Sequence, residues 1–155
     1  PESISVPKII SPADPYTLSR FTRAQETEYG RVLAELKDGR KETHWMWYIF
    51  PQIKGLGRSS NSEFYAIEHI EEALEYLRHP VLGVRLFECT EAVLAITGRS
   101  AHDVFGSPDD SKLRSCMTLF EFVSEPGSIF VSVLGKYFNG CRDDRTLNLL
   151  KQGTS

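Results

Sequence analysis

Cysteine is scarce in this chain, with three residues in 155: Cys89, Cys116 and Cys141. Their odd number and wide spacing are typical neither of a disulfide framework nor of a zinc cluster. Each falls in or beside an expected helix, so we interpret all three as reduced, buried, structural thiols. The four histidines have no metal-motif spacing, since the chain contains no HExxH pattern and no paired CxxC. The sequence therefore predicts no metal, and we assign no cofactor.

Long apolar runs and a strong charge excess are also missing. No run approaches the roughly 18 residues of a membrane-spanning helix, and residues 1–13 contain no apolar signal core. The formal net charge of −3 gives no reason to expect nucleic-acid or anionic-membrane partners. Neither a Gly-rich phosphate loop after a strand nor a GxSxG nucleophile elbow occurs. We therefore expect a cytoplasmic protein without nucleic-acid or membrane binding.

What the chain does have is the composition of one ordinary domain. Hydrophobic residues make up 41% and charged residues 25%, and 155 residues suffice to bury one core. There is no internal repeat or low-complexity tract. We expect a flexible N-terminal arm over residues 1–13 and a single helical domain over residues 14–155. The domain should be a monomer or a weak dimer.

Apolar residues recur at helical spacing almost throughout, with caps and glycines at the expected ends. The pattern predicts an all-α, compact domain of about seven helices and no strand pair. The expected helices cover residues 14–38, 61–78, 80–97, 101–105, 109–124, 129–138 and 143–150.

Two polar residues fall among the apolar positions of these helices. Gln25 must find hydrogen-bond partners if buried, or cost about 1–3 kcal/mol. It should bind a neighbouring backbone group or face a polar cavity. Arg85 could bind a ligand carboxylate, or it could pair with Glu88, which we favour.

The segment over residues 44–52, His-Trp-Met-Trp-Tyr-Ile-Phe-Pro-Gln, holds both tryptophans of the chain. Aromatic rings beside His44 and Gln52 are the mixture from which ligand pockets are built. An aromatic run in a chain of this size more often belongs to a hydrophobic core, where Trp45 and Trp47 would be structural. Both interpretations stay open from the residues alone.

The expected helix after Pro108 carries a second candidate. Lys112, Ser115 and Cys116 share one face, and the opening of the helix should offer free backbone amides. With Lys112 and Arg114 nearby, this opening could hold a phosphate or carboxylate. The alternative is an ordinary helix start with solvated basic side chains.

Several motifs follow one another along the chain, at residues 14–16, 20–21, 44–52, 65–67, 79–83, 85–86, 105–109, 112–120 and 146–147. Together they resemble one known family, the domain-of-unknown-function family number 1810, some of whose members are labelled calpastatin-like. The resemblance spans nearly the whole chain after residue 13 and implies a mainly helical fold. In place of a second serine after Ser115, usual in the family, this chain has Cys116.

Polar and aromatic residues at the family's motif positions are our candidate ligand-binding residues, because a purely structural family could use apolar side chains at many of these places. No catalytic residue is assigned. The candidates are His44, Trp45, Trp47, Gln52, Tyr65, Arg85, Asp109, Lys112, Arg114 and Ser115.

Two classes of function are compatible with these residues. The first is a small enzyme, such as a hydrolase, acting on a nucleotide-like metabolite of ADP-ribose or N-glycoside type, or on another anionic metabolite. Trp45 or Trp47 would stack on a ring, while Lys112 and Arg114 would hold the charge. A distant analogy with small helical N-glycosidases of the NADAR group favours this class. The second class is a noncatalytic binding or protein-interaction module.

Overall fold

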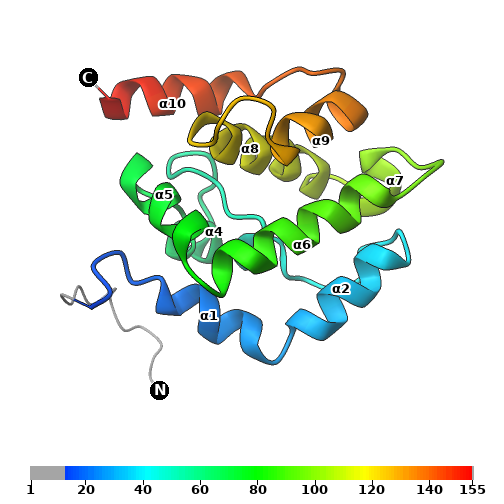
Figure 1. Cartoon of the computed structure of the whole chain (residues 1–155), viewed down its shortest axis with the longest axis horizontal. Helices are drawn as coiled ribbons and strands as arrows, with labels where there is room; N and C mark the ends of the chain where they lie inside the picture. Colours follow the sequence, from blue (N-terminus) through cyan, green and yellow to red (C-terminus); the bar gives the residue numbers. More distant parts are fainter. Residues whose placement is uncertain (1–12, 155) are drawn as a thin grey trace.

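The computed structural model describes residues 13–154. Over this range the chain folds into ten helices and forms no β-strand (Figure 1). The all-α prediction is confirmed, whereas the expected number of about seven helices is wrong. The helices are α1 (Ser19–Glu26), α2 (Tyr29–Lys37), α3 (Met46–Ile49), α4 (Ser60–Phe64), α5 (Ile70–Arg78), α6 (Leu82–Ala95), α7 (Ala101–Phe105), α8 (Asp109–Phe122), α9 (Ile129–Phe138) and α10 (Asp144–Thr154). Residues 1–12, which make up nearly all of the expected arm, lie outside the described range.

Two of the three additional helices arise because two expected helices are each divided into two. The first expected helix breaks at Thr27 and Glu28, so that α1 packs against α3 while α2 packs against α6. The expected helix over residues 61–78 is interrupted between Tyr65 and His69. There Ile67 forms a parallel bridge with Ile53, through its own N–H to the carbonyl of Gln52 and through its carbonyl to the N–H of Lys54, both at 2.8 Å.

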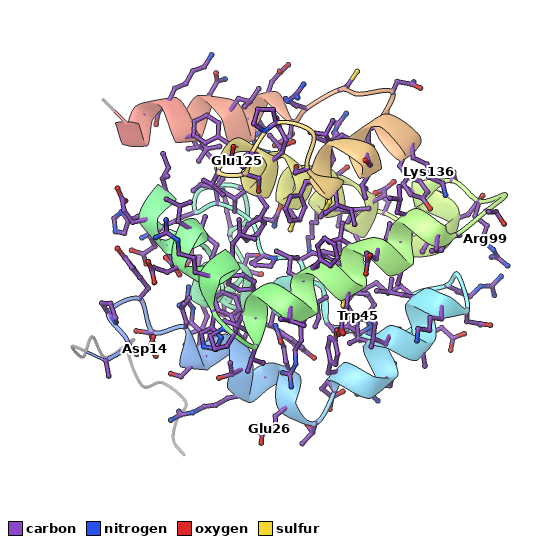
Figure 2. All side chains as sticks on the ribbon, viewed as in Figure 1. Asp14, Glu26, Trp45, Arg99, Glu125 and Lys136 are labelled. Carbon is purple, nitrogen blue, oxygen red and sulfur yellow. The ribbon has the colours of Figure 1, made fainter. Side chains whose placement is uncertain are left out.

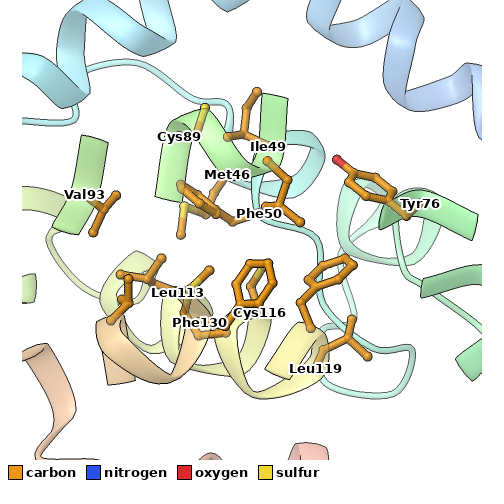
Figure 3. Close-up of a cluster of buried hydrophobic side chains, with 14 of the residues drawn as sticks. Met46, Ile49, Phe50, Tyr76, Cys89, Val93, Leu113, Cys116, Leu119 and Phe130 are labelled. Carbon is orange, nitrogen blue, oxygen red and sulfur yellow. The ribbon is translucent and has the colours of Figure 1, made fainter. Parts of the chain in front are cut away.

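A short helix, α3, supplies the remaining difference, because it lies within the aromatic segment to which no helix was assigned. Its residues Met46 and Ile49 are buried, and Phe50 directly follows them in the core. Figure 3 shows these three side chains in one cluster with Cys116 and Phe130, which come from α8 and α9. The aromatic segment therefore contributes to the centre of the molecule.

Helices α6 and α8 organise the packing. Helix α6 contacts α2, α3, α5 and α9, and α8 contacts α7, α9 and α10. In Figure 1, α8, α9 and α10 form one layer, while α1 and α2 lie on the opposite side of α6. The expected apolar stripe of α6 is confirmed, since Leu82, Leu86, Cys89 and Val93 are all buried.

Local signals account for several helix ends. Helix α2 ends two residues before Gly39, where a backbone φ of +77° lets the N–H of Arg40 return to the carbonyl of Glu35. The Asp14 carboxylate accepts hydrogen bonds from the N–H groups of Leu18 and Ser19 at the start of α1. Burial alone would raise the pKa of Asp14, but these hydrogen bonds lower it.

The three cysteines are free, and two of them are buried. Burial raises the pKa of Cys89 to about 12 and that of Cys116 well above its ordinary value. Cys141 is exposed, because it lies in the turn after α9 instead of in a helix. The expectation of a buried thiol is therefore wrong for this residue.

No helix between residues 13 and 154 combines the length and the apolarity needed to cross a bilayer.

Candidate functional site

A small pocket is built almost entirely from one stretch of chain that follows the second tryptophan. The cavity volume is about 10 Å³, which is room for roughly one water molecule. Three of the predicted binding residues, Trp47, Gln52 and Tyr65, meet here, and we call this the Trp47 pocket. Its other lining residues are Ile53, Lys54, Gly55, Gly57, Ser62, Glu63 and Ala66.

Three polar groups in the wall of the Trp47 pocket lack a hydrogen-bond partner among residues 13–154. The indole Nε1 of Trp47 is buried without an acceptor. The Gln52 carboxamide and the Tyr65 hydroxyl also form no side-chain hydrogen bond within this range, but they are not among the buried unpaired atoms and are open to water. Burial raises the pKa of Tyr65, so its hydroxyl stays protonated at neutral pH. A pocket wall with unpaired hydrogen-bonding groups is suited to a polar ligand.

The loop over the pocket is held closely by its neighbours. A Cβ added at Gly57 would lie 2.5 Å from the Cβ of Ser62, so glycine is required for this approach. Gly55 has a φ of +108° and faces the side chain of Leu149 on α10. Ser59 closes the segment by accepting a hydrogen bond from the N–H of Ser62 at the start of α4.

Sequence reasoning missed the residue that fixes one wall of the pocket. Arg20 is buried in α1, and its guanidinium donates to the carbonyls of Phe64 and Ala66 at 2.8 and 2.9 Å. It also donates to the Glu72 carboxylate on α5 at 2.7 Å. A buried arginine with this many acceptors holds the chain on both sides of Tyr65 in place. The sequence signal that could have identified Arg20 is its position in one of the segments that match the family.

Each tryptophan lies beneath a lysine. The Nζ of Lys112 is 5.3 Å from the ring centroid of Trp47, and that of Lys41 is 5.0 Å from Trp45. Asp109 connects the two lysines, at 2.8 Å from Lys41 and 3.6 Å from Lys112. These contacts connect four of the predicted binding residues into one group: Trp45, Trp47, Asp109 and Lys112.

Within this group, Trp45 lies in the hydrophobic core. It is 1% exposed and is drawn between α2 and α6 in Figure 2. Its indole N–H donates to Glu35 at 2.8 Å, and the same carboxylate accepts from Thr43 and from the N–H of Glu42. Burial alone would raise the pKa of Glu35, but these hydrogen bonds lower it to about 2. Glu35 is a second residue that the sequence analysis did not identify.

Three of the amides at the opening of helix α8, which were expected to be free, already have acceptors. The N–H groups of Asp110 and Lys112 donate to the carbonyls of Gly106 and Pro108. The N–H of Ser111 donates to the Asp110 carboxylate at 2.8 Å. Asp109 and Asp110 in the first turn already supply the negative charge that a helix N-terminus favours.

Arg114 and Ser115 lie apart from the Trp47 pocket. The guanidinium of Arg114 is 5.7 Å from the ring of Phe138 on α9, whereas Lys112 contacts Trp47. The hydroxyl of Ser115 is 3.2 Å from the Asp143 carboxylate, which also accepts from the N–H of Thr146. The structure therefore separates Lys112 from Arg114, which were expected to hold one charge together.

The remaining predicted residues have other surroundings. Arg85 donates to the Gln25 side chain at 3.3 Å and lies over the ring of Tyr29, so the expected pairing with Glu88 is wrong. Gln25 also donates to the backbone carbonyl of Tyr48 at 2.7 Å, which confirms the expected backbone interaction. His44 is exposed and does not line the Trp47 pocket.

These features define an all-helical domain with a small aromatic pocket, and residues 13–154 contain no cluster of His, Cys, Asp and Glu suited to a metal. The chain belongs to the family described as protein of unknown function (DUF1810), whose pattern matches residues 15–150. It is similar to the conserved hypothetical protein Rv1873 from Mycobacterium tuberculosis, with 48% identity and a TM-score of 0.88. The match covers 89% of this chain and 99% of that one. Comparison with curated proteins gives no match.

Proposed function

We propose that this protein binds a small anionic, nucleotide-like metabolite at the Trp47 pocket. The observation that carries the proposal is the indole N–H of Trp47, which is buried without an acceptor on a residue that lines the pocket. An unsatisfied buried donor costs about 1–3 kcal/mol. A ligand acceptor that reached this N–H through a small movement of the pocket wall would recover that free energy.

The charges around the site support an anionic ligand. Lys54 lines the pocket, and Lys41 and Lys112 lie over the two tryptophans. Lys41 and Lys112 share the single carboxylate of Asp109, so their two positive charges are met there by one negative charge. Electrostatic attraction of a ligand follows from such a local excess.

A flat ligand portion would contact Trp47 and not Trp45. Trp45 is 1% exposed and its ring is part of the core, whereas Trp47 and Tyr65 are half-buried. Aromatic faces of this kind stack on planar groups. Hydrolysis of an N-glycoside or ADP-ribose compound is the narrower form of the proposal, supported by the NADAR analogy.

A noncatalytic interaction module is the second candidate, and one observation favours it. Helix α6 presents Val84 and Phe87 to solvent at 53% and 47% exposure, with Val81 just before the helix at 37%. Adjacent exposed apolar side chains are typical of protein-binding surfaces. Copurification of a polypeptide that is lost in Phe87→Ser would support this function.

Ligand binding is tested by calorimetry and thermal shift with phosphate, ribose 5-phosphate, nucleoside monophosphates and ADP-ribose. We expect at least one to stabilise the wild type, and Lys112→Met to weaken its binding by about 5- to 150-fold, the equivalent of 1–3 kcal/mol. Methionine retains an apolar side chain over Trp47 but removes the charge. Lys37→Met, an exposed lysine of α2 outside the site, is the matched control. No stabilisation by any of these compounds at millimolar concentration would contradict the proposal.

A further inference from the structure

The outward face of α6 is left uncovered by the rest of residues 13–154. It carries the exposed apolar side chains of Val84 and Phe87, with that of Val81 just before the helix, and in Figure 1 no other helix is drawn over it. Beside it, α2 and α6 enclose an open groove of about 420 Å³. The apolar residues that line this groove are Leu33, Ala92, Ala95 and Ile96.

Two carboxylates of α6 join the exposed apolar residues to the groove. Glu88 and Glu91 line the groove, and they lie one helical turn after Val84 and Phe87. The exposed side chains and the groove therefore form one continuous surface, which we call the α6 face.

The charged groups of the α6 face have no opposite charge to pair with. The Tyr29 hydroxyl donates to Glu88 and holds its carboxylate in place. Glu91 forms no ion pair among residues 13–154, and neither does Lys37, the basic residue of the groove lining. Two acids and one base are thus free for a partner, and the excess is negative.

We propose that the α6 face binds an amphipathic helix of a partner protein, in which lysine or arginine residues flank an apolar stripe. The groove between two helices accepts the side-chain ridge of a third. The apolar stripe would cover Phe87 and fill the groove, while the basic residues pair with Glu88 and Glu91. This inference is independent of the Trp47 pocket and rests on the interaction module named above as the second candidate function, because it specifies that module's partner.

A second copy of the chain fits the α6 face less well than a basic partner. Two antiparallel α6 helices that set Phe87 of one copy against Ala92 of the other would also set Glu88 against Glu91. Four carboxylates would then meet at the centre of the interface, where like charges oppose association. A basic helix replaces this repulsion by attraction, which both speeds the encounter and selects the partner.

The test uses two synthetic helical peptides with the same leucine stripe, one with lysine and one with glutamate at the polar positions. Fluorescence anisotropy measures the binding of each labelled peptide to the full chain. The lysine peptide should bind about tenfold or more tightly than the glutamate peptide, and added salt should weaken it. In proton–nitrogen correlation spectra, the amides of α6 and α2 should shift most.

Variants of the α6 face should change this affinity in opposite directions. Phe87→Ser should weaken the lysine peptide about tenfold, because an apolar contact is lost. Glu91→Lys should weaken it about two- to fivefold, whereas Lys37→Glu should strengthen it by a similar factor. Phe122→Ser and Glu125→Lys change an exposed phenylalanine and an exposed glutamate elsewhere, and these controls should bind like the wild type.

Equal affinity for the two peptides, or a lysine-peptide affinity that is the same in Phe87→Ser, Glu91→Lys and the wild type, would overturn the inference. Sedimentation of the wild type as a dimer that dissociates in Phe87→Ser would assign the α6 face to a second copy and overturn it as well. Loss of a copurified polypeptide in Phe87→Ser, without binding of the lysine peptide, would overturn the basic partner but leave the interaction function in place.

Discussion

Trp45 and Trp47 stand two residues apart, and each lies beneath a lysine, yet their surroundings differ in hydrogen bonding. The indole N–H of Trp45 is bonded to Glu35, and Lys41 above it donates to both Asp109 and the carbonyl of Thr43. The indole N–H of Trp47 has no acceptor among the described residues. A fully paired aromatic group is typical of a structural role, whereas the unpaired N–H of Trp47 is the basis of the binding role proposed above.

The sharpest test of this comparison is to remove each ring. Trp45→Ala should lower the free energy of unfolding by about 3–5 kcal/mol, because a core tryptophan leaves a cavity and Glu35 loses a donor. Trp47→Ala should cost less, since its side chain is half-buried and forms no hydrogen bond. Urea denaturation monitored by circular dichroism measures both. Equal losses would show that the two tryptophans are equally structural.

A second test addresses the carboxylate that pairs with Trp45. Glu35→Gln should lower the free energy of unfolding at pH 7 by about 1.5–3 kcal/mol, because a neutral amide accepts charge-assisted hydrogen bonds less well. The unaltered Thr43 hydroxyl and Glu42 N–H would remain as donors. Chemical denaturation at pH 7 checks this value.

The pH dependence of that difference has a definite sign. The pKa of Glu35 is lowered from 4.5 to about 2 in the folded protein, so its stabilising contribution is present above pH 4.5 and is lost as the pH falls towards 2. The gap between wild type and Glu35→Gln should therefore narrow over that window. A gap that is constant from pH 7 to pH 3 would contradict the assignment.

The smallest effects should come from the two lysines. Lys41→Met should lower the free energy of unfolding by about 1–2 kcal/mol, because the Lys41 side chain is 6% exposed and its ion pair with Asp109 is lost. Asp109 would then be paired with Lys112 alone. Lys112→Met should cost less than about 1 kcal/mol, since its ion pair is longer and more exposed. Thermal unfolding of the two variants gives the comparison. The reverse order would mean that Lys112 is the structural partner.

Local patterns predicted the helices and most of their ends, because caps and apolar stripes act over a few residues. The end of α2 just before Gly39 and the buried stripe of α6 are examples. The break between α4 and α5 could not be predicted in this way. It depends on the pairing of Ile67 with Ile53, and a bridge between distant residues leaves no periodic signal.

The candidate site was predicted only in part, again because local sequence patterns do not show which distant elements meet. Trp47, Gln52 and Tyr65 are close in sequence and meet in one pocket, and Lys112 joins them from α8. Arg114 and Ser115 share α8 with Lys112 but contact Phe138 and Asp143 instead. Spacing on one helix defines a face, but it does not show which neighbouring element that face contacts.

Arg20 couples helix α1 to the Trp47 pocket. Because its guanidinium holds the carbonyls of Phe64 and Ala66, fraying of α1 would release the segment that carries Tyr65. Linkage is reciprocal, so a ligand that requires an ordered Tyr65 would in turn slow amide hydrogen exchange in α1, on the far side of the pocket wall. If the proposed ligand binds, α1 would report occupancy from a distance, without any probe placed in the pocket itself.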